Sequence, residues 1–500
     1  MTTFQRDKPA PDHVGRRARV VIPLASVTLA FAVSVGHIFS PLVTIAVTFG
    51  GLAAALAVSR TRAMVIAGIL VVAFIPIYWA PAIPRTHVGI LPVLPVCLVL
   101  LPRALRERYR LRITSVDWLM AGYVGLRILA SLINSSRGAG AAVDALLYTA
   151  APYAVFRLLG LDRTVRRSAA FGIVVAGVIA SALGIREYST RYNPFFKRFP
   201  NGVQHAYWTK VDHRFRHQRP EASFGHADVL GLFLAFAAVL AICLAWRETG
   251  TAKRMALYAS VMVCLYGIAD TLERGPIVFL LIAFPILLVL EIRRGSPSRV
   301  IAAVLGALVI FSATSFGATA FKLRDASSSG EIQASAEDRY ATIRAMRDTR
   351  YFSVLGHHQD SPDELSAHES IGLSTGLGAV ENAFMWTYLA YGFFAMIAFA
   401  AMAIPIGRAA FDARVDLLDR GWLAIVVSSF VIFLSVDLSA QFGHFFWMAL
   451  GVGASIAQQR NRPAVDDALS SRNGDVDAYG GLDHEASPDN GERFGALAPQ

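Results

Sequence analysis

The sequence predicts an all-α, polytopic integral membrane protein with about 14 transmembrane helices and two long external loops. Hydrophobic residues make up 55% of the 500-residue chain and charged residues only 17%, whereas about a quarter of the residues of a soluble domain are charged. The apolar residues gather in runs of about 20, the length of helix that crosses a hydrocarbon core of about 30 Å. These observations exclude an ordinary water-soluble enzyme.

The apolar runs define the expected helices in chain order. They cover residues 20–36, 41–58, 63–80, 87–102, 116–133, 140–157, 168–185, 225–246, 254–270, 275–291, 299–316, 379–405, 421–437 and 442–458. The first run follows several arginines, as in a secretory signal. No cleavage site of small residues follows it, so we expect it to be a retained helix.

The runs divide the chain into five expected parts. Residues 1–19 form an N-terminal segment, and 20–316 hold the first eleven helices together with an external loop at 186–224. Residues 317–378 form a large external loop, 379–458 the last three helices and 459–500 a tail. The tail is rich in Asp, Gly, Ser and Pro, so we expect it to be disordered.

Basic residues set the expected orientation, because cytoplasmic loops of membrane proteins carry an excess of Lys and Arg. The expected inner loops all carry basic residues; they are 59–62, 103–115, 157–167, 247–254, 291–299 and 407–420. Both termini then lie in the cytoplasm and both long loops lie outside. The net charge of +11 is explained by orientation, and we expect no nucleic-acid partner.

Ionisable residues within the spans cost free energy and usually face a cavity or a partner. In the predicted topology the outer half holds Arg127, Asp144, His226, Asp228, Asp270, Glu273, Arg274, Glu381, Asp437 and His444. The inner half offers only boundary residues such as Asp117. An ion pair between Arg127 and Asp144 is one interpretation for those two residues. For the set as a whole we favour a polar cavity open to the external leaflet.

The external loop 186–224 carries more Lys and Arg than Asp and Glu, on the side where positive charge is usually scarce. A solvated surface would explain this excess. The alternative is a funnel for an anionic ligand, because Arg grips phosphate oxygens in pairs. The candidate ligand-binding residues of the loop and the cavity are Lys210, Arg216, Arg219, Arg127 and His226.

The external loop 317–378 contains an expected amphipathic helix at 335–351, with Arg339 among the arginines around its apolar face. Such a helix can lie beside lipid phosphates on the outer leaflet or cover the membrane domain. The His, Asp and Glu residues that follow match no zinc spacing such as H-E-x-x-H. Cys97, Cys243 and Cys264 lie within apolar runs. We expect no metal, no cofactor and no disulfide framework.

Four segments resemble motifs of the O-antigen ligase and polymerase-like family, which are membrane glycosyltransferases of bacterial envelopes. Arg219 to Gly231 resembles an arginine followed by a Gly-His helix entry, and Thr271 to Pro276 resembles a Ser-Arg-Gly turn. Arg339 to Gly356 is similar to an amphipathic stretch ending in Pro-Leu-Leu-Gly, and Glu381-Asn382 with Gly392 is similar to a His-Asn…Gly motif. The order, spacing and sidedness of the segments carry the resemblance.

The resemblance implies a polyprenyl-diphosphate-linked glycan as donor, a glycan hydroxyl as acceptor and transfer on the periplasmic face of a bacterial inner membrane, without metal. Arg274 and Arg219, with Arg339 third, then stabilise the leaving diphosphate. Glu381 takes the acceptor's proton. Arg274 could instead be a membrane-edge residue, and Glu381 an acid at a helix start. Family ligases have His where this chain has Glu381, which favours a polymerase.

Two alternatives to a polymerase remain. An O-antigen ligase would use lipid A core as the acceptor. A transporter of lipid-linked glycan also needs many spans and a charged cavity, but the sequence shows no inverted repeat and no pair of interrupted helices. In each case the expected partners are membrane lipids and other polysaccharide-assembly proteins.

Overall fold

The computed structural model describes residues 61–76, 90–134, 138–193, 195, 213–214, 217–292, 353–356, 382–412, 415–436, 438 and 440–460. Within these residues the protein is helical. The one sheet among them is a short antiparallel ribbon that pairs His213–Arg214 (β1) with His217–Gln218 (β2). This confirms the predicted all-α class for the described part of the chain.

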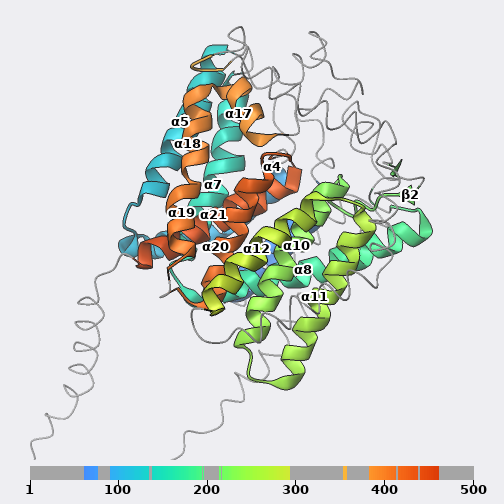
Figure 1. Cartoon of the computed structure of the whole chain (residues 1–500). Helices are drawn as coiled ribbons and strands as arrows, with labels where there is room; N and C mark the ends of the chain where they lie inside the picture. Colours follow the sequence, from blue (N-terminus) through green and yellow to red (C-terminus); the bar gives the residue numbers. More distant parts are fainter. Residues whose placement is uncertain are drawn as a thin grey trace, which may run out of the picture. The chain divides into compact units, whose positions relative to one another are not determined.

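The helices follow the predicted apolar runs closely (Figure 1). In chain order they are α3 (Thr61–Phe74), α4 (Ile90–Arg106), η2 (Arg108–Arg110), α5 (Ser115–Asn134), α6 (Gly138–Asp144), η3 (Ala145–Ala150), α7 (Ala151–Leu159), α8 (Arg163–Thr190), α10 (Ala227–Arg247), α11 (Thr251–Thr271), α12 (Gly275–Ile292), α17 (Ala383–Tyr391), α18 (Phe393–Ala401), α19 (Ala403–Ala410), α20 (Leu417–Ile432) and α21 (Ala440–Arg460). The predicted runs 20–36, 41–58 and 299–316 and the expected helix 335–351 lie outside the described residues.

Six helices among the described residues are long and apolar enough to cross a membrane. They are Ser115–Asn134, Ala142–Leu159, Arg163–Thr190, Ala227–Arg247, Thr251–Thr271 and Phe393–Ala410. The outer faces of several helices expose large apolar side chains, such as Leu132 and Ile133 on α5 and Leu281 on α12. Apolar helix faces of this kind suit a lipid environment. The structure therefore has the character of a helical membrane protein.

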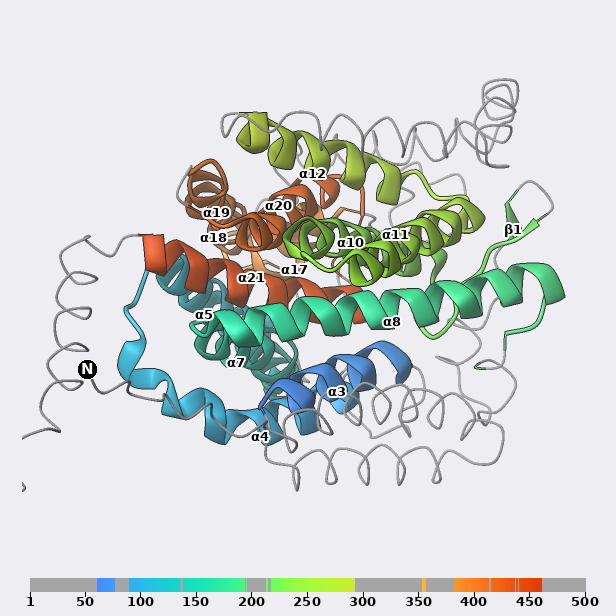
Figure 2. The ribbon, with the colours of Figure 1, turned by 90° about the horizontal axis from the view of Figure 1, so that it is seen from below.

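Helix α10 lies at the centre of one helix group. It packs against α8, α11, α12 and α20, and aromatic pairs such as Phe233–Phe445 join it to α21. Nearly all of its side chains are buried, as expected for a helix that is apolar all round. Figure 2 shows α8 running between α3 and this group, in agreement with the contacts of α8 with α3, α10 and α11.

Consecutive helices alternate in direction, so the bundle has two ends. We call them the Arg219 end and the Asp117 end, after one residue at each. At the Arg219 end, Ser223 Oγ donates to the Ala73 carbonyl at the end of α3 (2.7 Å), and Gln441 at the start of α21 donates to the Ile75 carbonyl (2.9 Å). At the Asp117 end, the start of α5 contacts Gln458 near the end of α21. The helix termini thus assemble into two separate polar layers.

One predicted span is interrupted, which corrects the sequence prediction. The run 379–405 breaks at Gly392, whose φ of 92° ends α17 and starts α18. The spanning segment there is Phe393–Ala410, so α17 is a separate helix that precedes it. The run 140–157 stays helical through α6, a π-helical turn (η3) and α7, and its residues Ala142–Leu159 are long and apolar enough to span. Apolar content alone revealed neither the break nor the π-helical turn.

Candidate functional site

Arg219 lies at the centre of a polar cluster between the segment before α10 and the turn between α11 and α12. Its guanidinium forms an ion pair with Glu273, and its Nε donates to the Thr271 carbonyl at 3.3 Å. Arg219 is 6% exposed and Glu273 7% exposed. A buried charge pair of this kind fixes the two segments that carry it. Arg219 therefore ties the segment before α10 to the turn between α11 and α12.

Glu187, near the end of α8, anchors the same segment. Its Oε2 accepts hydrogen bonds from the backbone N–H groups of Glu221 (3.0 Å) and Ala222 (2.7 Å). Its Oε1 accepts from Asn193 Nδ2 at 2.9 Å. The side chain is only 1% exposed. Charged acceptors of several N–H donors make strong hydrogen bonds, so Glu187 holds the turn after Arg219 in place.

The backbone at this end is strained in three places. Arg191, Ala222 and Leu272 are the non-glycine residues with positive φ in the described part of the chain, at 53°, 47° and 55°. Each such residue costs about 1–3 kcal/mol, and strain of this kind gathers at functional sites. Here the strained residues border the Arg219 cluster, because Leu272 separates Thr271 from Glu273 and Ala222 binds Glu187.

Arg274 follows directly on this turn and presents its side chain differently. It is exposed, while its carbonyl accepts the N–H groups of Ile277 (3.1 Å) and Val278 (3.0 Å) to begin α12. The start of α10 covers the other side of the turn, where Gly231 contacts Pro276. Arg274 thus combines a backbone carbonyl that begins α12 with an exposed position at a helix N-terminus.

The fourth predicted motif and the turn that carries Arg274 both lie beside Val436. Asn382 caps α17 by accepting from Phe384 and Met385 N–H, both at 3.0 Å, and Ala383 N donates to the Val436 carbonyl at 3.2 Å. A Cβ on Gly275 would lie 3.6 Å from Val436 Cγ2. Ala383 and Gly275, the chain neighbours of Asn382 and Arg274, therefore both lie beside Val436.

The structure thus brings together three of the four segments singled out in the sequence: 219–231, 271–276 and the residues after Glu381. His226 caps α10 by accepting from Asp228 N at 3.3 Å, which gives it a structural role at the same end. Glu381, Arg339, Lys210 and Arg216 lie outside the described residues, so their predicted roles stay predictions. Sequence reasoning assigned no role to Glu187, and it counted Glu273 among the residues of the polar cavity without pairing it with Arg219.

Arg127 occupies a different position, near the break between α17 and α18. It donates from Nη1 to Thr149 Oγ1 at 2.7 Å and from Nη2 to Tyr391 Oη at 3.0 Å. Its guanidinium carbon lies 4.6 Å from the Tyr391 ring centroid. Asp144, the partner that the sequence interpretation gave to Arg127, is buried as well.

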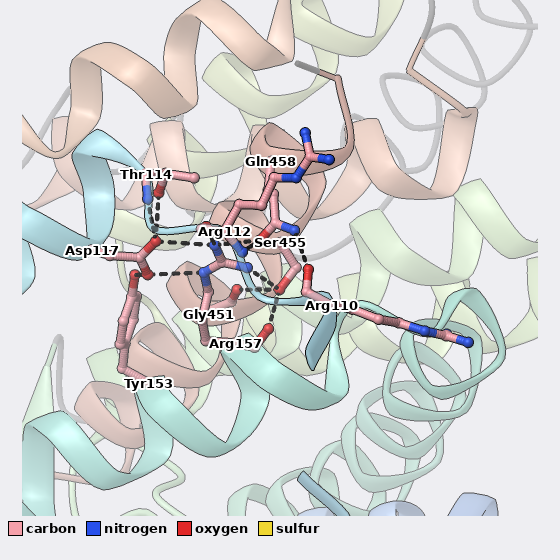
Figure 3. Close-up of polar contacts among 9 residues, drawn as sticks. All are labelled: Arg110, Arg112, Thr114, Asp117, Tyr153, Arg157, Gly451, Ser455 and Gln458. Atoms are coloured by element: carbon pink, nitrogen blue, oxygen red, sulfur yellow. Dashed lines mark hydrogen bonds and ion pairs between the residues drawn. The ribbon is translucent and has the colours of Figure 1, made fainter. Parts of the chain in front are cut away.

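Another polar cluster lies at the Asp117 end, at the start of α5 and the ends of α7 and α21 (Figure 3). Arg157, 2% exposed, binds Asp117 through Nε–Oδ1 (2.9 Å) and Nη2–Oδ2 (3.0 Å). Tyr153 Oη donates to Asp117 Oδ1 at 2.6 Å, and Arg157 Nη2 donates to Gln458 Oε1 at 2.8 Å. Because the charges are matched within the cluster, its role is structural.

A second buried pair lies at the same end, between α8 and α20. Arg166 binds Asp419 in a bidentate manner, with Nε–Oδ1 at 2.8 Å and Nη2–Oδ2 at 2.9 Å. Arg166 is 0% exposed and Asp419 6% exposed. The sequence assigned Arg157, Arg166 and Asp419 to loops, whereas in the structure they lie in the last turn of α7 and the first turns of α8 and α20. Partners up to 301 residues apart leave no local signal in a sequence.

No group of three or more His, Cys, Asp or Glu side chains within the described residues is arranged to hold a metal ion. The three cysteines are buried and free. Searches for a matching protein-family model and for a similar curated protein both found nothing.

Proposed function

We propose that the protein is a membrane glycosyltransferase that moves a polyprenyl-diphosphate-linked oligosaccharide to a sugar hydroxyl on the periplasmic face. The observation that carries this proposal is the meeting of residues 219–231, 271–276 and 382–383 at one end of the helix bundle. These segments are distant in sequence and each brings polar or charged groups. Their meeting supports one shared site.

Arg274 is the residue proposed to bind the diphosphate of the donor. Its exposed guanidinium stands at the start of α12, where backbone N–H groups and the helix dipole also favour an anion. As the glycosidic bond to the diphosphate breaks, negative charge grows on the leaving oxygen, and fixed positive charge stabilises it. Arg219 is engaged by Glu273, so its proposed part is to position the Arg274 turn.

Glu381 is the proposed base that takes the proton of the acceptor hydroxyl. It is the chain neighbour of Asn382, and consecutive Cα atoms are about 3.8 Å apart. Asn382 Nδ2 donates to the Leu434 carbonyl at 2.8 Å, within two residues of Val436, which also contacts the Arg274 turn. This proximity supports a base close to the donor's diphosphate.

The proposed setting is a bacterial inner membrane crossed about 14 times, with both termini in the cytoplasm and the Arg219 end facing the periplasm. The acceptor is a second lipid-linked glycan in a polymerase. In an O-antigen ligase it is lipid A core. Mass analysis of lipid-linked glycans in a deletion strain separates these two enzymes, because single repeat units accumulate without a polymerase whereas free polymer accumulates without a ligase.

Substitution of Arg274 tests the proposed reaction directly. We expect Arg274→Ala to abolish polymer formation and Arg274→Lys to restore little of it, because Lys lacks the planar donor fork. The matched control is Arg254→Ala, an exposed arginine near the start of α11 at the other end of the helix. Polymer yields are read on gels from complemented deletion strains with equal protein levels. Full activity of Arg274→Ala would refute the assignment.

A transporter of lipid-linked glycan is a second candidate, favoured by one observation. Arg127 binds Thr149 in the π-helical turn η3 and Tyr391, the residue before the break at Gly392. Interrupted helices are the usual binding elements of transporters. If repeat units accumulate on the cytoplasmic face of the deletion strain, transport is the function. If they accumulate on the periplasmic face, transfer is the function.

A further inference from the structure

Arg127 is a buried cation whose nearest partners are neutral. It is 6% exposed, donates to the hydroxyls of Thr149 and Tyr391, and lies against the rings of Tyr123 (5.7 Å) and Tyr391 (4.6 Å). None of these three partners carries a charge. An ionisable group inside a membrane protein is costly and usually marks a ligand site or an ion pathway.

The groups around Arg127 are rich in unused donors. Arg127 Nε and Ser131 Oγ are buried and have no hydrogen-bond partner among the described residues, and Ser131 lies one turn along the same face of α5. The hydroxyls of Thr149 and Tyr391 accept from Arg127, so each keeps its own O–H to donate. One positive charge, one N–H and three O–H groups are together complementary to an oxyanion.

Both hydroxyl partners of Arg127 lie at or next to a place where a helix departs from regular α geometry. Thr149 lies in the π-helical turn η3, and Tyr391 is the last residue of α17 before Gly392. π-Helical turns occur frequently at functional sites. Exposed apolar residues flank the cluster, with Leu132 and Ile133 on α5 and Leu146 in η3. The cluster therefore lies beside a surface that suits a lipid chain.

We propose that Arg127, Ser131, Thr149 and Tyr391 form a second anion site, which binds the phosphate or diphosphate head group of a lipid. This site is separate from Arg274. The two are joined by α17, whose nine residues span about 13 Å, with Asn382 at one end and Tyr391 at the other. The inference goes beyond glycosyl transfer and holds for a transporter as well.

Binding of farnesyl diphosphate to the full-length protein in nanodiscs tests the proposal by isothermal titration calorimetry. The wild-type protein should bind two molecules, and Arg127→Gln and Arg274→Gln should each remove one. Inorganic pyrophosphate and farnesol serve as further probes. If pyrophosphate displaces farnesyl diphosphate and binds as tightly, the ligand is a free anion. If tight binding requires the farnesyl chain, the ligand is a lipid. If only Arg127→Gln removes binding, this site stands and the Arg274 site fails.

Milder variants keep the test valid even if Arg127→Gln does not fold. Tyr391→Phe retains the ring against Arg127 but removes one O–H group, and Thr149→Val removes another at constant size. Each should weaken binding at this site about tenfold, as expected for loss of one charge-assisted contact. Thr190→Val, at an exposed position at the end of α8, is the matched control and should have no effect. Unchanged affinity in both Tyr391→Phe and Thr149→Val would overturn the proposal.

Discussion

Arg219 differs from Arg274 in its burial, because Arg219 is 6% exposed whereas Arg274 is an exposed residue. Its ion pair with Glu273 and its bond to the Thr271 carbonyl hold the turn that presents Arg274. Removing one member of a buried pair leaves the other charge uncompensated, which costs more than removing both. The two arginines of the candidate site therefore have different energetic roles although they looked alike in the sequence.

This difference gives a double-mutant prediction. Arg219→Gln and Glu273→Gln should each destabilise the protein by about 3–5 kcal/mol, whereas the double variant should cost less than the sum of the two. Unfolding in detergent, followed by circular dichroism, measures each free energy. Strictly additive effects would show that the two side chains do not depend on each other.

Glu187 is a residue whose structural role could not be predicted from the sequence. It belongs to a charged stretch at a helix end, which in a sequence is typical of a solvated surface. In the structure it is buried and accepts three hydrogen bonds from Asn193, Glu221 and Ala222. The acceptor role depends on a backbone turn 34 residues away, and no local pattern encodes that approach.

At the scale of elements, Gly392 sets the geometry between α17 and α18. Its φ of 92° is in a region that residues with a Cβ rarely adopt. An added Cβ would also contact the carbonyl group of Val354. The next residue, Phe393, donates its N–H to the Ser353 carbonyl at 3.1 Å. The segment at 353–356 is therefore packed against the break.

Replacing Gly392 should be far more harmful than replacing another helical glycine. We expect Gly392→Ala to destabilise the protein by about 2 kcal/mol or more, from backbone strain and the contact with Val354. Gly407→Ala in α19, where an added Cβ meets nothing within 4 Å, should be neutral or stabilising by up to about 1 kcal/mol. Thermal stability in detergent compares the two. Equal effects would indicate that the break at Gly392 is not under strain.

The positions of the helices were predictable because their apolar runs are long and are separated by charged segments. The break at Gly392 and the π-helical turn at 145–150 could not be predicted. The break involves close contacts of Gly392 with Val354, which is distant in sequence, and the π-helical turn has no distinct composition. For the candidate site, the sequence correctly placed segments 219–231 and 271–276 at the same end of the bundle. It did not reveal that Arg219 is paired.

At the scale of the whole molecule, orientation can be tested with single cysteines. The three native cysteines are buried, so new ones at exposed positions can be labelled selectively. Thr190→Cys at the Arg219 end should react with a membrane-impermeant maleimide in intact spheroplasts. Lys253→Cys near the start of α11 should react only after permeabilisation. The reverse pattern would place the Arg219 end in the cytoplasm and exclude periplasmic transfer.

The cluster around Arg157 also has a consequence for synthesis of the chain. Asp117 and Arg157 leave the ribosome early. Ser455 and Gln458, which bind Arg157, are made much later, and Gln458 follows Arg157 by 301 residues. A nascent chain that stops before α21 therefore lacks two of the hydrogen-bond partners of Arg157. We expect such truncated chains to be degraded by quality-control proteases, because only a nearly complete chain can form the whole cluster.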